Sequence, residues 1–218
     1  MTTQYYIIRP AVDTPETGNA FPAAESYDNY DFNAPNSVHK LNFREFPDFV
    51  PDIRFKLAKG AKLTDMLSQA AISAHGFLIN EKLKNVFEQF NMVPHKYYPA
   101  SIEDHHGNFH RYFWLHLIWE EWKNIIDWKN SNFFIRRVSK NMGPIEISSY
   151  DDFLSLKEEL GVLKMIDFEK IIFKNKIQFD LFTQLKSDVY STKKLKEYIE
   201  FNSFSGVDFK IATSVFSH

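Results

Sequence analysis

Four histidines stand close together in the stretch DHHGNFHRYFWLH, and such clusters are where metal chemistry is expected first. Neutral imidazole nitrogens bind zinc and other transition metals. The histidines of this stretch are His105, His106, His110 and His116. Gly107 and Asn108, however, would break any helix that brought two of them to one face.

A strand does not bring these histidines together either. His110 and His116 would share a strand face, but a rise of about 3.3 Å per residue places them about 20 Å apart. No acidic or histidine partner stands at a spacing typical of a metal site. We therefore expect a polar hairpin tip before a buried strand, with no cofactor. His105, His106 and His110 remain the candidate metal ligands of an alternative hypothesis.

Acidic pairs are the second group of candidate functional residues, and their candidate role is binding rather than catalysis. Each pair falls on the outer face of a predicted helix, where a solvated surface is the ordinary use. Electrostatic complementarity to a basic partner is the functional alternative, because it speeds encounter and aids discrimination. The candidate partner-binding residues are Glu120, Glu121, Asp151, Asp152, Glu158 and Glu159.

The four tryptophans could form a ligand cage or anchor an interface, since aromatic residues dominate interface hot spots. Trp119 and Trp122 fall on the apolar face of a predicted helix, which favours core packing. Trp128 stands between Asp127 and Lys129, and we keep it as a candidate partner contact alongside the core alternative.

Motifs of common enzyme classes are absent from the sequence. The serines lack a G-x-S-x-G elbow, and no G-x-G-x-x-G, P-loop or H-E-x-x-H is present. The chain has no cysteine, which excludes disulfides, Cys-ligated metals and a thiol nucleophile. A net charge of −2 and a pI of about 6.4 give no general attraction to nucleic acid or anionic membranes. We predict a binding protein that is not an enzyme.

The sequence also bears on the compartment. The start, MTTQYYIIRPAVD, lacks the basic and apolar regions of a signal peptide. No run approaches the ~20 apolar residues that span a bilayer. We expect a soluble, cytoplasmic protein, and the sequence does not decide its oligomeric state.

The elements that must position these residues begin with an irregular N-terminal part. The chain has 218 residues, of which 44% are hydrophobic and 17% aromatic, enough for one large domain or two small ones. Residues 4–10 predict a strand, and residues 11–40 a long loop or extended arm. We divide the chain into this N-terminal strand and arm, 1–44, and an α+β domain, 45–218, expected to form one compact unit.

Two stretches of the chain share one pattern: a short strand, a polar cap, a helix and a second strand. They are residues 77–100 and 189–212. Asn80 and Thr192 are the predicted caps, because their side-chain oxygens can accept from free N–H groups of the first turn. The pair could be a duplicated module, or two uses of a common unit with no shared history.

Periodicity and cap residues predict the remaining elements. Residues 62–70 favour a short helix, 111–118 a central aromatic strand, and 118–127 an amphipathic helix or a few helical turns. Ser149 and Asp152 resemble a capping box that begins a helix, which Gly161 ends. Strands are expected at 132–138, 144–149 and 168–179. We predict an α+β fold with a mixed or antiparallel sheet, packed helices and two similar strand–capped helix–strand units.

The order of these segments resembles the immunity protein 11-like family of bacterial polymorphic toxin systems. The resemblance covers roughly residues 45–213, and the first 44 residues match loosely. It is carried by order and spacing more than by any single motif. The matching features are the capped helix from Asn80 to Phe90, the aromatic strand from Tyr112 to Leu117, Asp127 with Ser131, and the C-terminal set Ser191, Leu195, Lys196, Gly206, Val207 and Phe209.

The resemblance implies a cytoplasmic protein that binds and neutralises a cognate toxin polypeptide. It supplies no catalytic residues. Two other hypotheses stay open: a metal- or small-ligand-binding protein or enzyme that uses the His105–His110 segment, and an adaptor unrelated to toxins.

Overall fold

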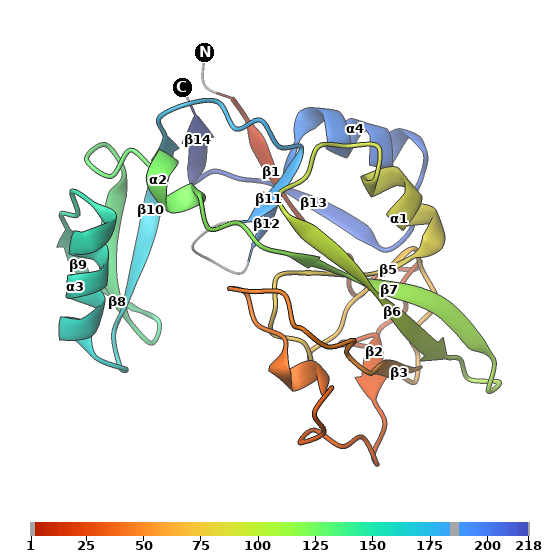
Figure 1. Cartoon of the computed structure of the whole chain (residues 1–218). Helices are drawn as coiled ribbons and strands as arrows, with labels where there is room; N and C mark the ends of the chain where they lie inside the picture. The colour runs from red at the N-terminus through yellow and green to blue at the C-terminus, as the bar shows by residue number, and fades with distance from the viewer. Residues whose placement is uncertain (1–2, 184–187, 218) are drawn as a thin grey trace. The chain divides into compact units, whose positions relative to one another are not determined.

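The computed structural model describes residues 3–183 and 188–217, and their contacts divide them into two compact units (Figure 1). Unit 1 contains the described residues of 1–5, 120–178 and 211–218. Unit 2 contains those of 6–119 and 179–210. Residues 6–44 of the predicted N-terminal arm therefore lie in the same unit as residues 45–119.

A six-stranded sheet dominates unit 2, with the strand order β2-β3-β6-β7-β5-β4. Strands β3 and β6 run parallel, whereas the other neighbours in this sheet run antiparallel. Its elements in chain order are β2 (Ala24–Ser26), the 3-10 helix η1 (Val38–Lys40), β3 (Ile53–Leu57), β4 (Met66–Leu67), β5 (Gly76–Asn80), α1 (Glu81–Phe87), β6 (His95–Glu103) and β7 (Phe109–Leu117). The predicted aromatic strand is β7, and it lies inside the sheet as expected.

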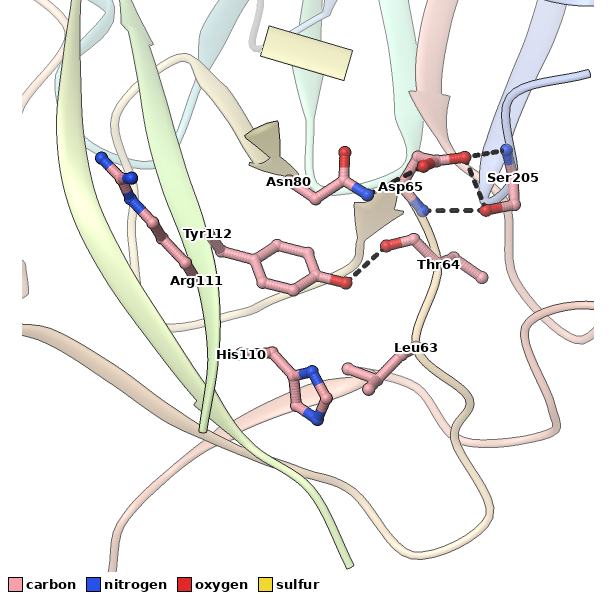
Figure 2. A pocket seen from close by; sticks show the side chains of 8 residues that line it. All are labelled: Leu63, Thr64, Asp65, Asn80, His110, Arg111, Tyr112 and Ser205. Atoms are coloured by element: carbon pink, nitrogen blue, oxygen red, sulfur yellow. Dashed lines mark hydrogen bonds between the residues drawn. The ribbon is translucent and has the colours of Figure 1, made fainter. Parts of the chain in front are cut away.

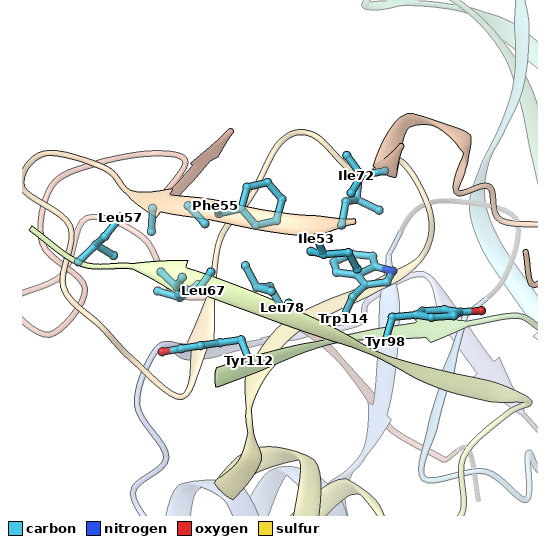
Figure 3. Packing of buried hydrophobic residues seen from close by; sticks show 14 of the residues in the cluster. Ile53, Phe55, Leu57, Leu67, Ile72, Leu78, Tyr98, Tyr112 and Trp114 are labelled. Carbon is cyan, nitrogen blue, oxygen red and sulfur yellow. The ribbon is translucent and has the colours of Figure 1, made fainter. Parts of the chain in front are cut away.

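The two faces of β7 pack against different layers. Tyr112 and Trp114 enter a buried cluster with side chains of β3, β4 and β5, including Phe55 and Leu78 (Figure 3). On β5, Phe77 lies 6.4 Å from the ring of Phe87 on α1. Because alternate side chains of a strand point to opposite faces, an aromatic run of this kind needs cover on both sides.

A second sheet has the order β11-β12-β1-β13. Its strands are β1 (Tyr5–Pro10), β11 (Leu181–Thr183), β12 (Val189–Thr192) and β13 (Val207–Ile211), and the helix α4 (Lys193–Phe201) follows β12. Thr192 accepts a hydrogen bond from Leu195 N at 3.5 Å and so caps α4 as predicted.

The sheet of unit 1 has the order β14-β10-β8-β9. Its elements are α2 (Trp122–Ile125), β8 (Asn132–Arg137), β9 (Lys140–Ile145), α3 (Tyr150–Leu160), β10 (Met165–Phe173) and β14 (Val215–Ser217). Ser149 caps α3 by accepting from Asp152 N, and Gly161 ends it with a φ of +65°. In a capping box the Asp152 carboxylate would accept from the N–H of the cap residue, Ser149. Here it accepts from the N–H of the preceding residue, Ser148, at 3.1 Å.

The described residues thus form 14 strands in three sheets and four short α-helices, a mixed α+β fold that is mostly sheet. Both predicted strand–helix–strand units are present as elements, namely β5–α1–β6 and β12–α4–β13. In the first unit, β7 lies between β5 and β6 in the sheet. In the second unit, β1 lies between β12 and β13. Their origin by duplication stays a prediction.

Several predicted elements were wrong in type or extent, among them the strand at 168–179, which begins earlier and ends at Phe173 as β10. The helix at 62–70 is an irregular segment with β4, because Ser68 Oγ and O accept from the backbone N–H groups of Ala23 and Ala24. The helix at 118–127 is reduced to the four residues of α2, since Ile126 takes an extended conformation and pairs with Phe173. The predicted strand at 144–149 lies earlier, as β9.

No helix among the described residues has the length and apolar character needed to cross a membrane.

Trp128 lies in the aromatic core of unit 1 and is 6% exposed. Its ring stacks on Phe133 with centroids 5.6 Å apart and lies 5.9 Å from Phe153. Its Nε1 donates to Lys123 O at 3.1 Å. The side chain is therefore part of the core, which is the alternative that the sequence left open.

Trp128→Ala should lower the free energy of unfolding by about 3 to 5 kcal/mol, because it removes a large buried ring and leaves a cavity. Chemical denaturation followed by circular dichroism measures this change. Val162→Ala is the control, since Val162 is fully exposed and a surface change should stay within about 0.5 kcal/mol. A Trp128→Ala effect as small as that of the control would contradict the core assignment.

Candidate functional site

Asp65, directly before β4, is a buried polar residue of unit 2 with several hydrogen bonds, and it is 7% exposed. Its Oδ2 accepts from Ser205 N at 2.7 Å and from Ser205 Oγ at 2.8 Å. Its Oδ1 accepts from Asn80 Nδ2 at 2.8 Å (Figure 2). A buried carboxylate needs such donors, because desolvation of the charge is costly. These bonds hold three distant segments of the chain together.

Asn80 links this carboxylate to α1. Its Oδ1 accepts from Leu83 N at 3.0 Å, which confirms it as the predicted helix cap. Its backbone N–H donates to Asp65 O at 2.9 Å. The side chain thus accepts from the helix with one atom and donates to Asp65 with the other, so the start of α1 is fixed relative to β4.

A pocket of about 330 Å³ opens beside these residues, and we call it the β7 notch. It is lined by Leu63, Thr64, Asp65, Asn80, His110, Arg111, Tyr112 and Ser205 (Figure 2). The notch lies where the β5–β7 ladder ends, because Asn80 pairs with Tyr112 and the chain then turns into α1. Strand β7 continues beyond that pair to Phe109.

Tyr112 lines the notch, and its hydroxyl donates to Thr64 O at 2.6 Å. Burial raises the pKa of this hydroxyl, and the nearby Asp65 charge raises it further. Ser205 Oγ donates directly to the Asp65 carboxylate. Together with the bond from Ser205 N, this contact fixes the loop after α4 against the segment before β4.

The β6–β7 hairpin tip, residues 104–109, is organised by one carboxylate. Asp104 accepts from the backbone N–H groups of His106 and Asn108, at 2.8 and 2.9 Å. It also accepts from Asn108 Nδ2 at 3.1 Å and contacts His110 Nε2 at 2.8 Å. The His110 contact contributes most to a lowered pKa of Asp104. The polar hairpin tip predicted from the sequence is confirmed.

The side chains of the three tip histidines do not meet at one group. His105 Nε2 lies 3.3 Å from Ala61 O, His106 is exposed, and His110 is held by Asp104. In the described part of the chain, no three His, Asp or Glu side chains form a group that could hold a metal ion.

Two further histidines fasten a different segment. His116 on β7 is fully buried, and its Nε2 donates to Asn42 O at 2.7 Å, while Phe46 contacts its ring edge-on at 5.2 Å. Its neighbour His75 has its pKa lowered to about 4, first by burial and then by the proximity of His116. Burial lowers the pKa of His116 as well. Both rings are therefore neutral near pH 7, and their contacts hold residues 42–46 on the sheet.

The acidic candidates all belong to unit 1, and each is exposed. Glu120 pairs with Lys123 at 3.1 Å, and Glu121 stands at the start of α2. The other four lie on α3: Asp151 and Asp152 in its first turn, and Glu158 and Glu159 near its end. Hydrogen bonds from Ser148 lower the pKa of Asp152, which therefore also serves the local structure.

Sequence reasoning singled out Asn80, His110 and Tyr112 for other roles, but it missed Asp65 and Ser205. Asp65 and Ser205 are separated by 140 positions, and no local pattern links them. Gly206, included in the C-terminal family pattern, was the available signal. It has a φ of +73°, and a Cβ there would lie 2.2 Å from Met66 O and 2.5 Å from Thr64 Oγ1.

Gly206→Ala should therefore lower the free energy of unfolding by about 3 to 5 kcal/mol, from backbone strain and overpacking together. Gly107→Ala is the matched control in the same unit. Gly107 has a φ of +80°, but the nearest atom to its added Cβ is 4.0 Å away. The control should lose only about 1 to 2 kcal/mol. Equal losses of unfolding free energy in denaturant titrations would show that the short distances from the added Cβ at Gly206 do not contribute to the destabilisation.

The comparison with known proteins adds family membership to this geometry. The model of the immunity protein family Imm11 matches residues 1–214, and this range includes the first 44 residues. No curated protein matches the chain. The match confirms the resemblance seen in the order of the sequence segments, and it extends over nearly the whole chain. The protein therefore belongs to the Imm11 immunity protein family.

Proposed function

We propose that this protein binds a cognate toxin polypeptide in the cytoplasm of the producing cell and neutralises it by occlusion. The observation that carries the proposal is the family match over residues 1–214. An immunity role needs a stable framework and an exposed contact surface, and no catalytic centre of its own.

The polar contacts of the site support binding over chemistry. The Asp65 carboxylate accepts from Ser205 and Asn80, and the Asp104 carboxylate organises a turn. These groups hold segments of the chain in place. The rings of His105 and His110 contact different groups, and His106 is exposed, so no observation favours the metal-dependent alternative as a second candidate function.

The exposed acids of unit 1 are the proposed electrostatic contact with a basic face of the toxin. On α3, Asp151, Glu158 and Glu159 are all exposed, and Leu154, 42% exposed, lies among them. Complementary charge of this kind acts mainly on the rate of association. We include Glu120, Glu121 and Asp152 in the same contact. Glu120 also pairs with Lys123, Glu121 stands at the start of α2, and Asp152 also accepts from Ser148.

Co-expression with the toxin domain encoded beside this chain's gene tests the function itself. The full chain should restore growth to cells that make the toxin domain, and the two purified proteins should form a complex with a Kd in the nanomolar range or below, about −12 kcal/mol. Unrelieved toxicity together with no complex by calorimetry would contradict the proposal.

The acidic contact is tested by charge reversal on α3. The double variant Glu158→Lys/Glu159→Lys should slow association with that toxin domain by about tenfold at low salt, and less at high salt, because screening weakens exposed charges. Stopped-flow or surface-binding kinetics at two salt concentrations measure the rate constant.

The control for charge reversal has the same change in net charge elsewhere in unit 1. Glu146→Lys/Glu169→Lys alters two exposed acids that lie outside α3. This variant should associate nearly as fast as the unaltered chain. Equal slowing by both double variants would mean that net charge, rather than the α3 surface, governs association.

A further inference from the structure

The hairpin tip carries an exposed aromatic side chain on a rigid support. Phe109 is 68% exposed and pairs in register with Glu103 across the hairpin. The adjoining turn is closed by the hydrogen bonds to Asp104 and by two backbone bonds, from Asp104 N to Asn108 O and from Gly107 N to Asp104 O. Figure 1 shows the hairpin extending beyond the other strands of its sheet. Such a residue loses little freedom on binding, which favours affinity.

Arg111 is the second side chain, after Phe109, that is suited to contact a partner. It lines the notch beside the tip. Its guanidinium lies 5.0 Å from the centre of the Phe113 ring, a cation–π contact. Its side chain is 68% exposed, and its ion pair with Glu81 is long, at 3.5 Å. A guanidinium held in place but weakly paired is suited to receive a carboxylate in a two-point contact.

The charges around the tip select an acidic partner. Lys59 and Lys62 are exposed on the loop that His105 contacts through Ala61 O. The amine of Lys62 is bonded to a neutral backbone carbonyl, that of Pro15, so its charge is not offset there. The negative charge of Asp104 is largely enclosed, with its side chain 13% exposed. Two acids also lie near the tip and notch: the half-buried Glu103 accepts from the Tyr27 hydroxyl, and Glu81 is the distant partner of Arg111. Lys59 and Lys62 therefore remain to attract an acidic segment.

The backbone of β7 adds a reason to expect an extended segment. The ladder with β5 ends at Tyr112, and no strand of the described chain pairs with residues 109–111 on that side. An exposed sheet edge beside a pocket accepts a strand from a partner, with side-chain specificity supplied by the pocket.

We propose that the β7 notch and hairpin tip together bind an extended, acidic segment of the toxin. One carboxylate of the segment pairs with Arg111 in the notch, and an apolar side chain packs on Phe109. This inference rests on the proposed function and names the surface that anchors the partner in unit 2. Aromatic and arginine side chains are the types that most often contribute binding energy at interfaces.

The test compares two variants with two matched controls, all as full chains and against the toxin domain encoded beside this chain's gene. Phe109→Ala and Arg111→Glu alter the proposed anchor. Phe201→Ala is the aromatic control, because Phe201 is 89% exposed at the end of α4. Arg44→Glu is the charge control, because Arg44 is an exposed arginine over the Phe43 ring in the same unit.

Phe109→Ala should raise the Kd by about 30-fold or more, and Arg111→Glu by a similar factor, as expected of hot-spot residues. The controls should change it by less than about threefold, and all four variants should keep the unfolding midpoint of the unaltered chain. Complex formation should also slow hydrogen exchange of amides within residues 104–111.

The outcomes separate the inference from the function on which it rests. If the unaltered chain binds and protects but the two anchor variants behave like the controls, the notch and tip are not the anchor, and this inference alone is overturned. If the unaltered chain neither binds nor protects, the proposed function is overturned, and the inference with it.

Discussion

The hydrogen bonds of one buried carboxylate join segments of unit 2 that lie far apart in the sequence. Asp65 is nearly enclosed, and an enclosed charge is tolerated only when donors surround it. Its donors are the side chain of Asn80 and the backbone and hydroxyl of Ser205. The first begins α1 and the second follows α4, so a single group relates both helices to β4. Loss of either donor would leave a buried charge underbonded, and removal of Asp65 would leave buried donors without an acceptor.

The chain uses most of its chemically capable side chains to hold its structure. His75 and His116 are kept neutral by burial and hold an adjacent segment, and Asp104 closes a turn. The aromatic residues mainly fill the cores of the two units. This pattern agrees with membership of an immunity protein family. In the function that we propose, recognition depends on groups left exposed, such as Phe109 and the acids of α3.

Much of the local structure was predictable, because its causes lie within a few residues. Asn80, Ser149 and Thr192 cap helices through bonds to N–H groups three positions away, and Gly161 ends one through its own backbone freedom. The polar tip before β7 followed from its glycine, asparagine and histidines. Predictions failed where a distant partner decided the outcome. Residues 62–70 have a helical pattern, yet Ser68 bonds to the backbone near Ala23, and Ile126 pairs with Phe173 in place of continuing a helix.

The sequence by itself determined the α+β class, most element positions, the absence of cysteine chemistry and the family to which the chain belongs. These properties depend on composition, short-range periodicity and the order of segments. Only the tertiary structure decided that Trp128 is a core residue, that the rings of His105 and His110 contact different groups, and that Asp65 meets Ser205. Burial and contacts across 140 positions arise from packing of the whole unit, so no short stretch of sequence contains them.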